Sequence, residues 1–310
     1  MQDNALETLL VRAERVLARL EALLPQSLTA PDWTASVAFR YRRRGTTTWL
    51  EPVRQVARIH LEDLREVDTQ KERLLRNTRQ FVQGAPANNV LLTGARGTGK
   101  SSLIKACLQA FHAQGLRLIE VDKADLVDLP DLVDLVQGRP ERFIIYCDDL
   151  SFDEGEAGYK ALKSILDGTV AASGDNVLVY ATSNRRHLLP EYMKDNLGAR
   201  HDEEGELHPG EVVEEKISLS ERFGLWISFY PFSQSEYLEI VAQWLRHHGL
   251  EEAAIAAARQ EALVFALERG SRSGRVAFQF ARDWAGRGQA AQSELNASID
   301  APGPEGLDHV

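Results

Sequence analysis

The sequence predicts an α/β protein built on a parallel β-sheet with helices on both faces. Five short apolar runs follow Gly84, and segments with helical spacing separate the first four of them. These runs cover residues 89–94, 116–122, 142–149, 176–184 and 225–231. Runs rich in Val, Ile, Leu and aromatic residues, joined by helical crossovers, are typical of strands in a parallel sheet that is covered on both sides. After Pro231 the pattern is helical, which predicts a second, smaller helical subdomain.

The composition is that of a globular protein that buries a sizeable core. Of its 310 residues, 44% are hydrophobic and 26% are charged. The 36 basic and 46 acidic residues give a net charge of −10, which argues against wholesale coating of nucleic acid. Two cysteines, Cys107 and Cys147, are too few for a disulfide framework and suit a reducing compartment. No apolar run resembles a signal peptide or a membrane span, so we expect a cytoplasmic protein without membrane contact.

Several further segments have patterns of their own. Leucines at helical spacing predict a helix within residues 1–30, and residues 39–53 indicate either a hairpin or an extended arm. The repeating acidic and aliphatic residues of 125–136 favour a helix packed on the sheet over a docking surface. Three helices are predicted in the second subdomain, over 233–248, 251–269 and 273–285. Residues 195–216 are polar and acidic, which indicates a surface insertion, and residues 288–310 are predicted to be disordered.

The strongest motif is GARGTGKS at residues 94–101, which matches G-x-x-x-x-G-K-[ST] in full. An apolar run ends at its first glycine and a helical segment begins at its end, as a phosphate-binding P-loop requires. Backbone N–H groups of such a loop converge on phosphate oxygens at the positive end of the helix. We therefore expect ATP and Mg²⁺ to bind here, with Lys100 on the β- and γ-phosphates and the Ser101 hydroxyl on the metal. The predicted nucleotide-binding residues are Gly94, Ala95, Arg96, Gly97, Thr98, Gly99, Lys100, Ser101 and Ser102.

The apolar run 142–147 stops abruptly at two acids, Asp148 and Asp149. Carboxylates at the end of a strand next to a P-loop complete the metal side of such a site. We expect Asp148 to contribute to the magnesium site and Asp149 to orient or deprotonate the attacking water.

These residues resemble the AAA+ class of P-loop ATPases. Within that class, residues 68–194 resemble the bacterial family named domain of unknown function 815, through the phrases at 85–106, 143–168 and 179–196. Helicase-loader and transposition-helper ATPases resemble the chain more distantly. The resemblance implies a three-layer P-loop fold with a five-stranded parallel sheet in the order 5-1-4-3-2 and a C-terminal helical lid. It also implies four segments: an N-terminal helical and arm region (1–66), the AAA+ domain (67–231), the lid (232–287) and a tail (288–310).

The resemblance implies roles for three further residues. Asn184 matches the polar sensor residue that holds the attacking water, although an asparagine there also suits a helix cap. Arg222 matches the arginine finger that reaches the nucleotide of a neighbouring subunit, which implies a homo-oligomer; a plain surface arginine is the alternative. Arg275 resembles the second sensor at the start of a lid helix, and Arg272 competes for that role.

One departure from the class leaves two hypotheses open. Most hydrolytic members have Asp-Glu where this chain has Asp148-Asp149, and the shorter Asp149 carboxylate reaches less far. The first hypothesis is an ATPase that remodels or loads a protein or nucleic-acid client. The alternative is a nucleotide-controlled binding adaptor with little turnover.

Arginines and aromatic residues alternate in the segment 39–49. Interleaved residues of these two types can bind nucleic-acid phosphates and stack on bases. The same arginines can instead lie on a solvated face or pair with the chain's own acidic loop. The residues concerned are Arg40, Arg42, Arg43 and Arg44, beside Phe39, Tyr41 and Trp49.

Overall fold

The computed structural model describes residues 12–15, 28–152, 156–168, 175–184, 200–201, 207–208 and 219–299. Of the helix expected within residues 1–30, only the helical residues 12–15 and the non-helical residues 28–30 belong to this set. The insertion predicted at 195–216 lies outside it, except for the two short paired strands β7 (Arg200–His201) and β8 (Leu207–His208). Residues 300–310 of the predicted tail also lie outside it.

Seven of the described strands form one sheet, in the order β2-β1-β4-β5-β6-β3-β9. Their bounds are β1 Ala38–Arg44, β2 Thr47–Pro52, β3 Val90–Gly94, β4 Leu116–Glu120, β5 Arg142–Cys147, β6 Val177–Ser183 and β9 Leu225–Phe229. The five runs predicted from the sequence are β3, β4, β5, β6 and β9, which are parallel to their neighbours. Read from β9, their order is 5-1-4-3-2, so this order is confirmed.

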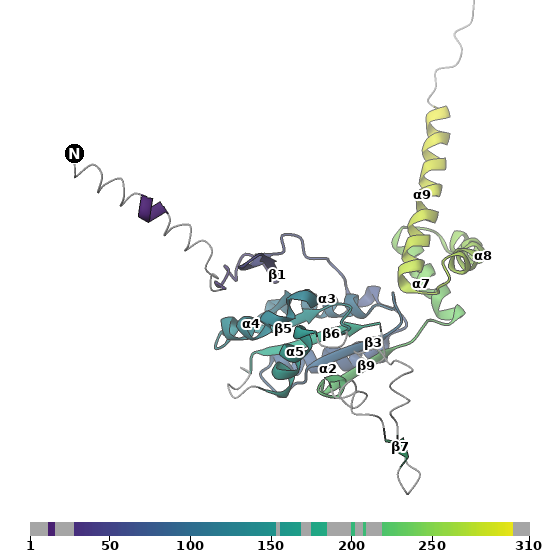
Figure 1. The fold of residues 1–310 in the computed structure, drawn as a ribbon. Coiled ribbons are helices and arrows are strands. Elements are labelled where there is room, and N and C mark those ends of the chain that lie inside the picture. Colours follow the sequence, from purple (N-terminus) through teal and green to yellow (C-terminus); the bar gives the residue numbers. More distant parts are fainter. Residues whose placement is uncertain are drawn as a thin grey trace, which may run out of the picture.

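The expectation of a five-stranded sheet is wrong, because the hairpin β1–β2 extends the sheet at the β4 edge (Figure 1). Strand β1 pairs in parallel with β4, and β2 pairs antiparallel with β1. Phe39 and Tyr41 of this arginine-rich segment are buried, while Arg40 forms an ion pair with Glu120 at 2.7 Å. Of the two alternatives for residues 39–53, the hairpin is therefore confirmed.

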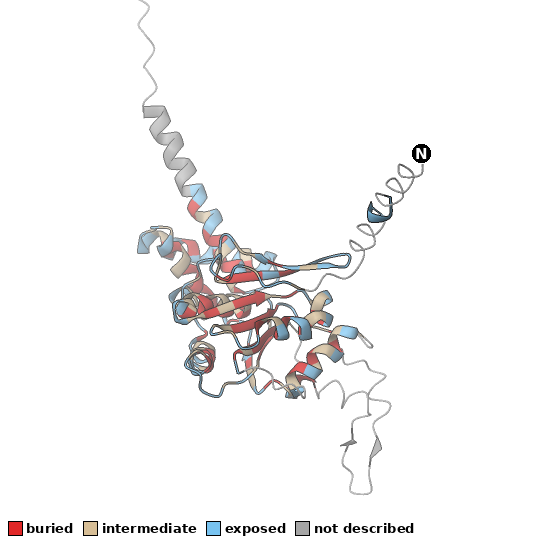
Figure 2. Cartoon of the chain, turned by 90° about the vertical axis from the view of Figure 1, so that its left-hand side faces the viewer, coloured by how far each residue is buried: buried red, intermediate tan, exposed pale blue. Residues whose placement is uncertain are grey.

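Helices cover both faces of the sheet because alternate residues of each central strand point to opposite faces. In β5, Ile144 and Tyr146 face helices α2 (Asp68–Val82) and α3 (Lys100–Phe111). Phe143, Ile145 and Cys147 face the other side, which is covered by α4 (Leu129–Val136) and α5 (Ala157–Asp167). Figure 2 shows the buried residues concentrated between these layers.

The acidic and aliphatic run at 125–136 forms the short helix η3 (Lys123–Asp128) followed by α4. Leu129, Leu132 and Val136 are fully buried in the core on this face. The expected packing on the sheet is therefore confirmed. Two further short helices are η1 (Leu61–Asp63) and η2 (His112–Gln114).

The segment predicted to be the lid, which we continue to call the lid, contains α7 (Gln234–His247), α8 (Glu252–Glu268) and α9 (Gly274–Ile299). Their number and order are those predicted from the sequence. Ser233 and Glu236 form a capping box at the start of α7. Helix α9 continues to Ile299, so residues 288–299, expected to be disordered, are helical.

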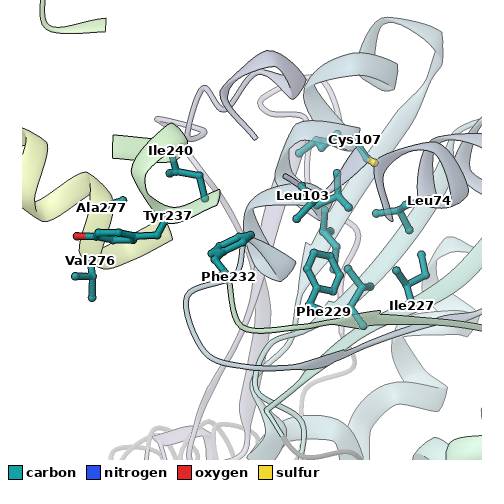
Figure 3. Close-up of a cluster of buried hydrophobic side chains, with 14 of the residues drawn as sticks. Leu74, Leu103, Cys107, Ile227, Phe229, Phe232, Tyr237, Ile240, Val276 and Ala277 are labelled. Atoms are coloured by element: carbon teal, nitrogen blue, oxygen red, sulfur yellow. The ribbon is translucent and has the colours of Figure 1, made fainter. Parts of the chain in front are cut away.

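The lid shares one apolar core with the α2–α3 face of the sheet. Figure 3 shows Phe232 between Phe229 and Leu103 on the sheet side and Tyr237 and Val276 on the lid side. This continuous core places the lid beside the carboxyl ends of the strands. None of the described helices has the length and apolar character needed to cross a membrane.

Candidate nucleotide-binding site

The loop between β3 and α3 contains the GARGTGKS motif, and α3 begins at Lys100. Gly94 has a φ of +123°, and a Cβ there would lie 1.9 Å from the carbonyl oxygen of Phe229 in β9. No side chain fits in that space, so glycine is required where the loop leaves the sheet. The loop thus has the strand, turn and helix geometry that a P-loop needs.

The Lys100 side chain lies inside this loop and is 6% exposed as a residue. Its Nζ donates hydrogen bonds to the carbonyl oxygens of Gly94 (2.7 Å) and Ala95 (2.8 Å), and to Oδ1 of Asn184 (3.0 Å). Burial lowers the pKa of Lys100 from 10.5 to about 8, and the nearby Asp148 and Asp149 carboxylates oppose this shift. The ammonium group is therefore held beside the P-loop at a cost in solvation.

Ser101 and Asp148 meet directly, since the Ser101 hydroxyl donates to Oδ1 of Asp148 at 2.7 Å. Thr182, in β6, donates to the same carboxylate oxygen at 2.5 Å. Burial of Asp148 favours its neutral form, but the hydrogen bonds from Thr182 and Ser101 outweigh it and lower the pKa of the carboxyl. An ionised carboxylate next to a hydroxyl is an oxygen donor set that fits Mg²⁺, which completes its shell with water and substrate phosphates.

Asp149 and Asn184 form the next contact, because Nδ2 of Asn184 donates to Oδ1 of Asp149 at 2.5 Å. Arg96 of the P-loop lies on the other carboxylate oxygen, with Nη2 at 3.7 Å from Oδ2. Asn184 therefore links Lys100 to Asp149. The structure thus brings together Lys100, Ser101, Asp148, Asp149 and Asn184, from three neighbouring strand ends.

Of the two candidates for the second sensor, Arg275 lies in the first turn of α9 and Arg272 lies two residues before this helix. Arg275 lies close to Gly97, since a Cβ added to the glycine would be 3.3 Å from the Cβ of Arg275. The positive charge of Arg275 contributes to lowering the pKa of Lys100. Arg272 instead lines a cavity of about 750 Å³ between the P-loop and the lid. That volume is within the range of about 300–1,000 Å³ for small-molecule sites. Its other lining residues include Ala95, Thr98, Phe232, Leu263 and Leu267.

Arg222 is not brought to this site. Arg222 precedes β9 and so lies near the amino ends of the parallel strands. The P-loop follows β3 and lies at their carboxyl ends. The guanidinium of Arg222 forms an ion pair with Asp167, the last residue of α5. Within one chain, Arg222 and Lys100 therefore lie at opposite ends of the parallel strands.

Three arginines of the hairpin, Arg40, Arg42 and Arg43, form ion pairs with acids of the chain. Arg42 forms an ion pair with Glu51 at 2.9 Å, and Arg43 forms ion pairs with Asp125 and Asp128. With the Arg40–Glu120 pair, the partners of these arginines are acids outside the loop 195–216 that the sequence suggests as their partner. Such pairing within the chain argues against nucleic-acid contact. Arg185, Arg186 and His187 lie outside the described residues.

Sequence reasoning missed two residues of the site, Thr182 and Ser273. Thr182 and Ser183 are buried polar residues at the end of an otherwise apolar strand, and that contrast is the signal that could have found Thr182. Ser273 lies against the P-loop glycine Gly97 and accepts a hydrogen bond from Val276 N in the first turn of α9. The contact between Ser273 and Gly97 depends on how the lid packs on the P-loop, and no local sequence pattern predicts that packing.

Comparison with known proteins gives one family. Residues 34–288 match the family described as "Protein of unknown function (DUF815)". No curated protein matches the sequence.

Two solved structures show weak similarity to the chain. The RuvB Holliday junction branch migration motor of Thermotoga maritima has a TM-score of 0.45 and 17% identity, over 73% of this chain and 64% of that one. The FIGL-1 AAA domain in complex with ADP has a TM-score of 0.48 and 17% identity, over 80% of each chain. The chain thus spans less than two thirds of the RuvB length, and the fold assignment rests on strand order and the P-loop rather than on these scores.

Proposed function

This chain belongs to the DUF815 family, whose description assigns no activity, and we propose from the site itself that it is an ATPase of the AAA+ type. The observation that carries the proposal is the chain of contacts Ser101–Asp148 and Lys100–Asn184–Asp149 at one edge of the sheet. A P-loop lysine, a metal-side pair of oxygen donors and a second carboxylate bonded to a polar sensor are the parts that phosphoryl transfer needs.

In the proposed binding mode, the N–H groups of the P-loop and the Lys100 ammonium hold the β- and γ-phosphates. Ser101 and Asp148 hold Mg²⁺, which when bound neutralises phosphate charge and orients the γ-phosphate. Arg275 or Arg272 contacts the nucleotide from the lid, so that lid position depends on the bound nucleotide.

In the proposed reaction, Asn184 and Asp149 hold a water molecule in line with the γ-phosphate. The water oxygen forms a bond to phosphorus while the bond from phosphorus to the bridging oxygen of ADP breaks. The products are ADP and phosphate, and Asp149 accepts the proton that the water loses. The expected cost of losing this base is about 10²- to 10⁴-fold in rate.

We further propose that Arg222 acts in trans, on the nucleotide of a neighbouring subunit in a homo-oligomer. Its position at the opposite end of the parallel strands from its own Lys100 supports this assignment. Hydrolysis would then be coupled to remodelling or loading of a protein or nucleic-acid client.

The test is steady-state ATP hydrolysis by the purified protein over a range of protein concentrations, with oligomer size recorded alongside. Lys100→Ala is the inactive variant, and Lys160→Ala, an exposed lysine of α5, is its matched control. Turnover per subunit that rises with concentration and is lost only in Lys100→Ala supports an assembled ATPase. Tight ATP binding without turnover above Lys100→Ala would favour the nucleotide-controlled adaptor instead.

A further inference from the structure

Asp149 has an unusual backbone conformation, with a φ of +51° in the left-handed region. Residues with a Cβ rarely adopt this region, and such outliers tend to persist where the surroundings hold them and function uses them. Asp149 follows directly after β5 and Asp148. The residue with the unusual backbone conformation is therefore the one that we propose as the base.

Thr182 holds the turn at Asp149 from the neighbouring strand β6. Its Oγ1 accepts a hydrogen bond from Asp149 N at 3.0 Å, and its carbonyl oxygen accepts one from Leu150 N at 2.6 Å. The same hydroxyl donates to Oδ1 of Asp148 at 2.5 Å. Thr182 is 2% exposed, so these contacts are formed away from solvent. One side chain thus contacts both acids.

The turn decides where the Asp149 carboxylate lies. In an extended strand, successive side chains point to opposite faces of the sheet, so a straight continuation of β5 would separate Asp149 from Asp148. With the left-handed turn, the Asp149 carboxylate instead reaches Asn184 at 2.5 Å and Arg96 at 3.7 Å. This turn brings an aspartate, which is shorter than glutamate, to the sensor residue.

We propose that Thr182 is a positioning residue that fixes where both carboxylates of the site lie. It positions Asp148 to bind the metal and Asp149 to bind the attacking water. The proposal rests on the proposed ATPase function and extends it to a residue that is not among those assigned to the nucleotide or the metal. A purely structural role is the competing interpretation, because a buried hydroxyl that loses its partners also destabilises a fold.

The experiment compares Thr182→Val, which keeps the shape and removes the hydroxyl, with Thr182→Ser, which keeps the hydroxyl. The matched control is Thr78→Val, because Thr78 is also fully buried and its hydroxyl contacts Leu74 O and Tyr180 Oη, away from the acids. Three quantities are measured for each variant: the melting temperature, kcat and KM for ATP, and the Mg²⁺ concentration at half-maximal binding of trinitrophenyl-ATP.

We expect Thr182→Val to lower kcat about 10- to 100-fold with little change in KM, and to shift the Mg²⁺ midpoint to a higher concentration. We expect Thr182→Ser to have a kcat and a Mg²⁺ midpoint close to those of the wild type. Thr78→Val lowers the melting temperature but leaves kcat and the Mg²⁺ midpoint as in the wild type. If the valine variant does not fold, Thr182→Ala also removes the hydroxyl and takes its place.

The proposal is overturned if Thr182→Val and Thr78→Val have the same kcat and the same Mg²⁺ midpoint. If the wild type binds ATP but does not hydrolyse it, the proposed ATPase activity is wrong. The Mg²⁺ midpoint then still tests whether Thr182 positions Asp148. A wild type that binds no nucleotide overturns the proposed function, and this proposal with it.

Discussion

Gly97 in the P-loop lies directly against Ser273, the residue before the last helix of the lid. A Cβ on Gly97 would lie 2.8 Å from Ser273 Oγ and 2.9 Å from its Cβ, and the glycine has a φ of +74°. The absence of a side chain thus lets the lid meet the P-loop. This contact connects the proposed nucleotide site to lid position.

Substituting Gly97 is therefore expected to displace the lid. Gly97→Ala must shift Ser273 as well as adopt a left-handed φ, which we expect to lower the free energy of unfolding by about 1–3 kcal/mol. Gly115→Ala is the control, because Gly115 also has a positive φ, of +92°, but has open space around its Cβ position. Amide hydrogen exchange at residues 274–281 should increase in Gly97→Ala and not in Gly115→Ala. Equal exchange in the two variants would contradict the contact.

ATP affinity is expected to depend on pH through Lys100. Burial lowers its pKa from 10.5 to about 8, so the ammonium that we propose to contact phosphate is progressively lost above that pH. The affinity should be nearly constant below pH 8 and fall above it, approaching tenfold per pH unit. Fluorescent-nucleotide titrations measure this, and Lys100→Ala should bind weakly with no such slope.

The same shift has a defined sign for stability. Folding disfavours the charged lysine, so stability of the nucleotide-free protein should rise as pH increases from about 8 towards 10.5. Urea unfolding of wild type and Lys100→Ala at several pH values measures the difference. A Lys100 contribution that falls with rising pH would contradict the direction of the pKa shift.

Arg222 is expected to be required for hydrolysis but not for binding. Arg222→Ala should lower kcat about 10³-fold, the effect of losing an arginine finger, while ATP affinity stays the same. Arg259→Ala, an exposed arginine of α8, is the control and should retain turnover.

Mixing two inactive variants tests whether the finger acts in trans. Lys100→Ala keeps its Arg222, and Arg222→Ala keeps its P-loop, so a mixed oligomer contains some complete sites. Partial recovery of turnover in the mixture supports a finger in trans. No recovery, with oligomers confirmed by size, would mean that Arg222 does not act across subunits.

Arg43 is expected to stabilise the sheet edge rather than bind nucleic acid. Its partner Asp128 has a side chain only 13% exposed and also accepts a hydrogen bond from Tyr41 Oη at 2.6 Å. Arg43→Ala should lower the free energy of unfolding by about 1–2 kcal/mol, because Asp128 loses its charged partner. Arg44→Ala, at the end of β1, should change it by less than about 0.5 kcal/mol.

DNA titration of the same variants at low salt provides the second measurement. If the hairpin binds DNA, both variants should weaken binding, with a reduced salt dependence. We expect neither effect, since Arg40, Arg42 and Arg43 are already paired with acids of the chain.

Much of the fold and of the phosphate site was predictable because the signals are local. The P-loop motif, the abrupt end of β5 at Asp148 and the apolar runs all occur within short stretches of sequence. The hairpin β1–β2 was harder to place, because its arginines look like a solvated arm. Strand β1 joins the sheet by pairing with β4, and two of its arginines pair with acids far along the chain, Glu120 and Asp128.

The sequence by itself determined that this chain has a phosphate-binding loop, five parallel strands and a helical subdomain after them. Local spacing is sufficient for each, since a P-loop and an amphipathic period are read within a few residues. Only the tertiary structure decided that Thr182 contacts both acids, that Asp149 turns towards Asn184, and that Gly97 meets the lid. Each of these depends on backbone angles and on packing between segments distant in sequence, which local patterns do not specify.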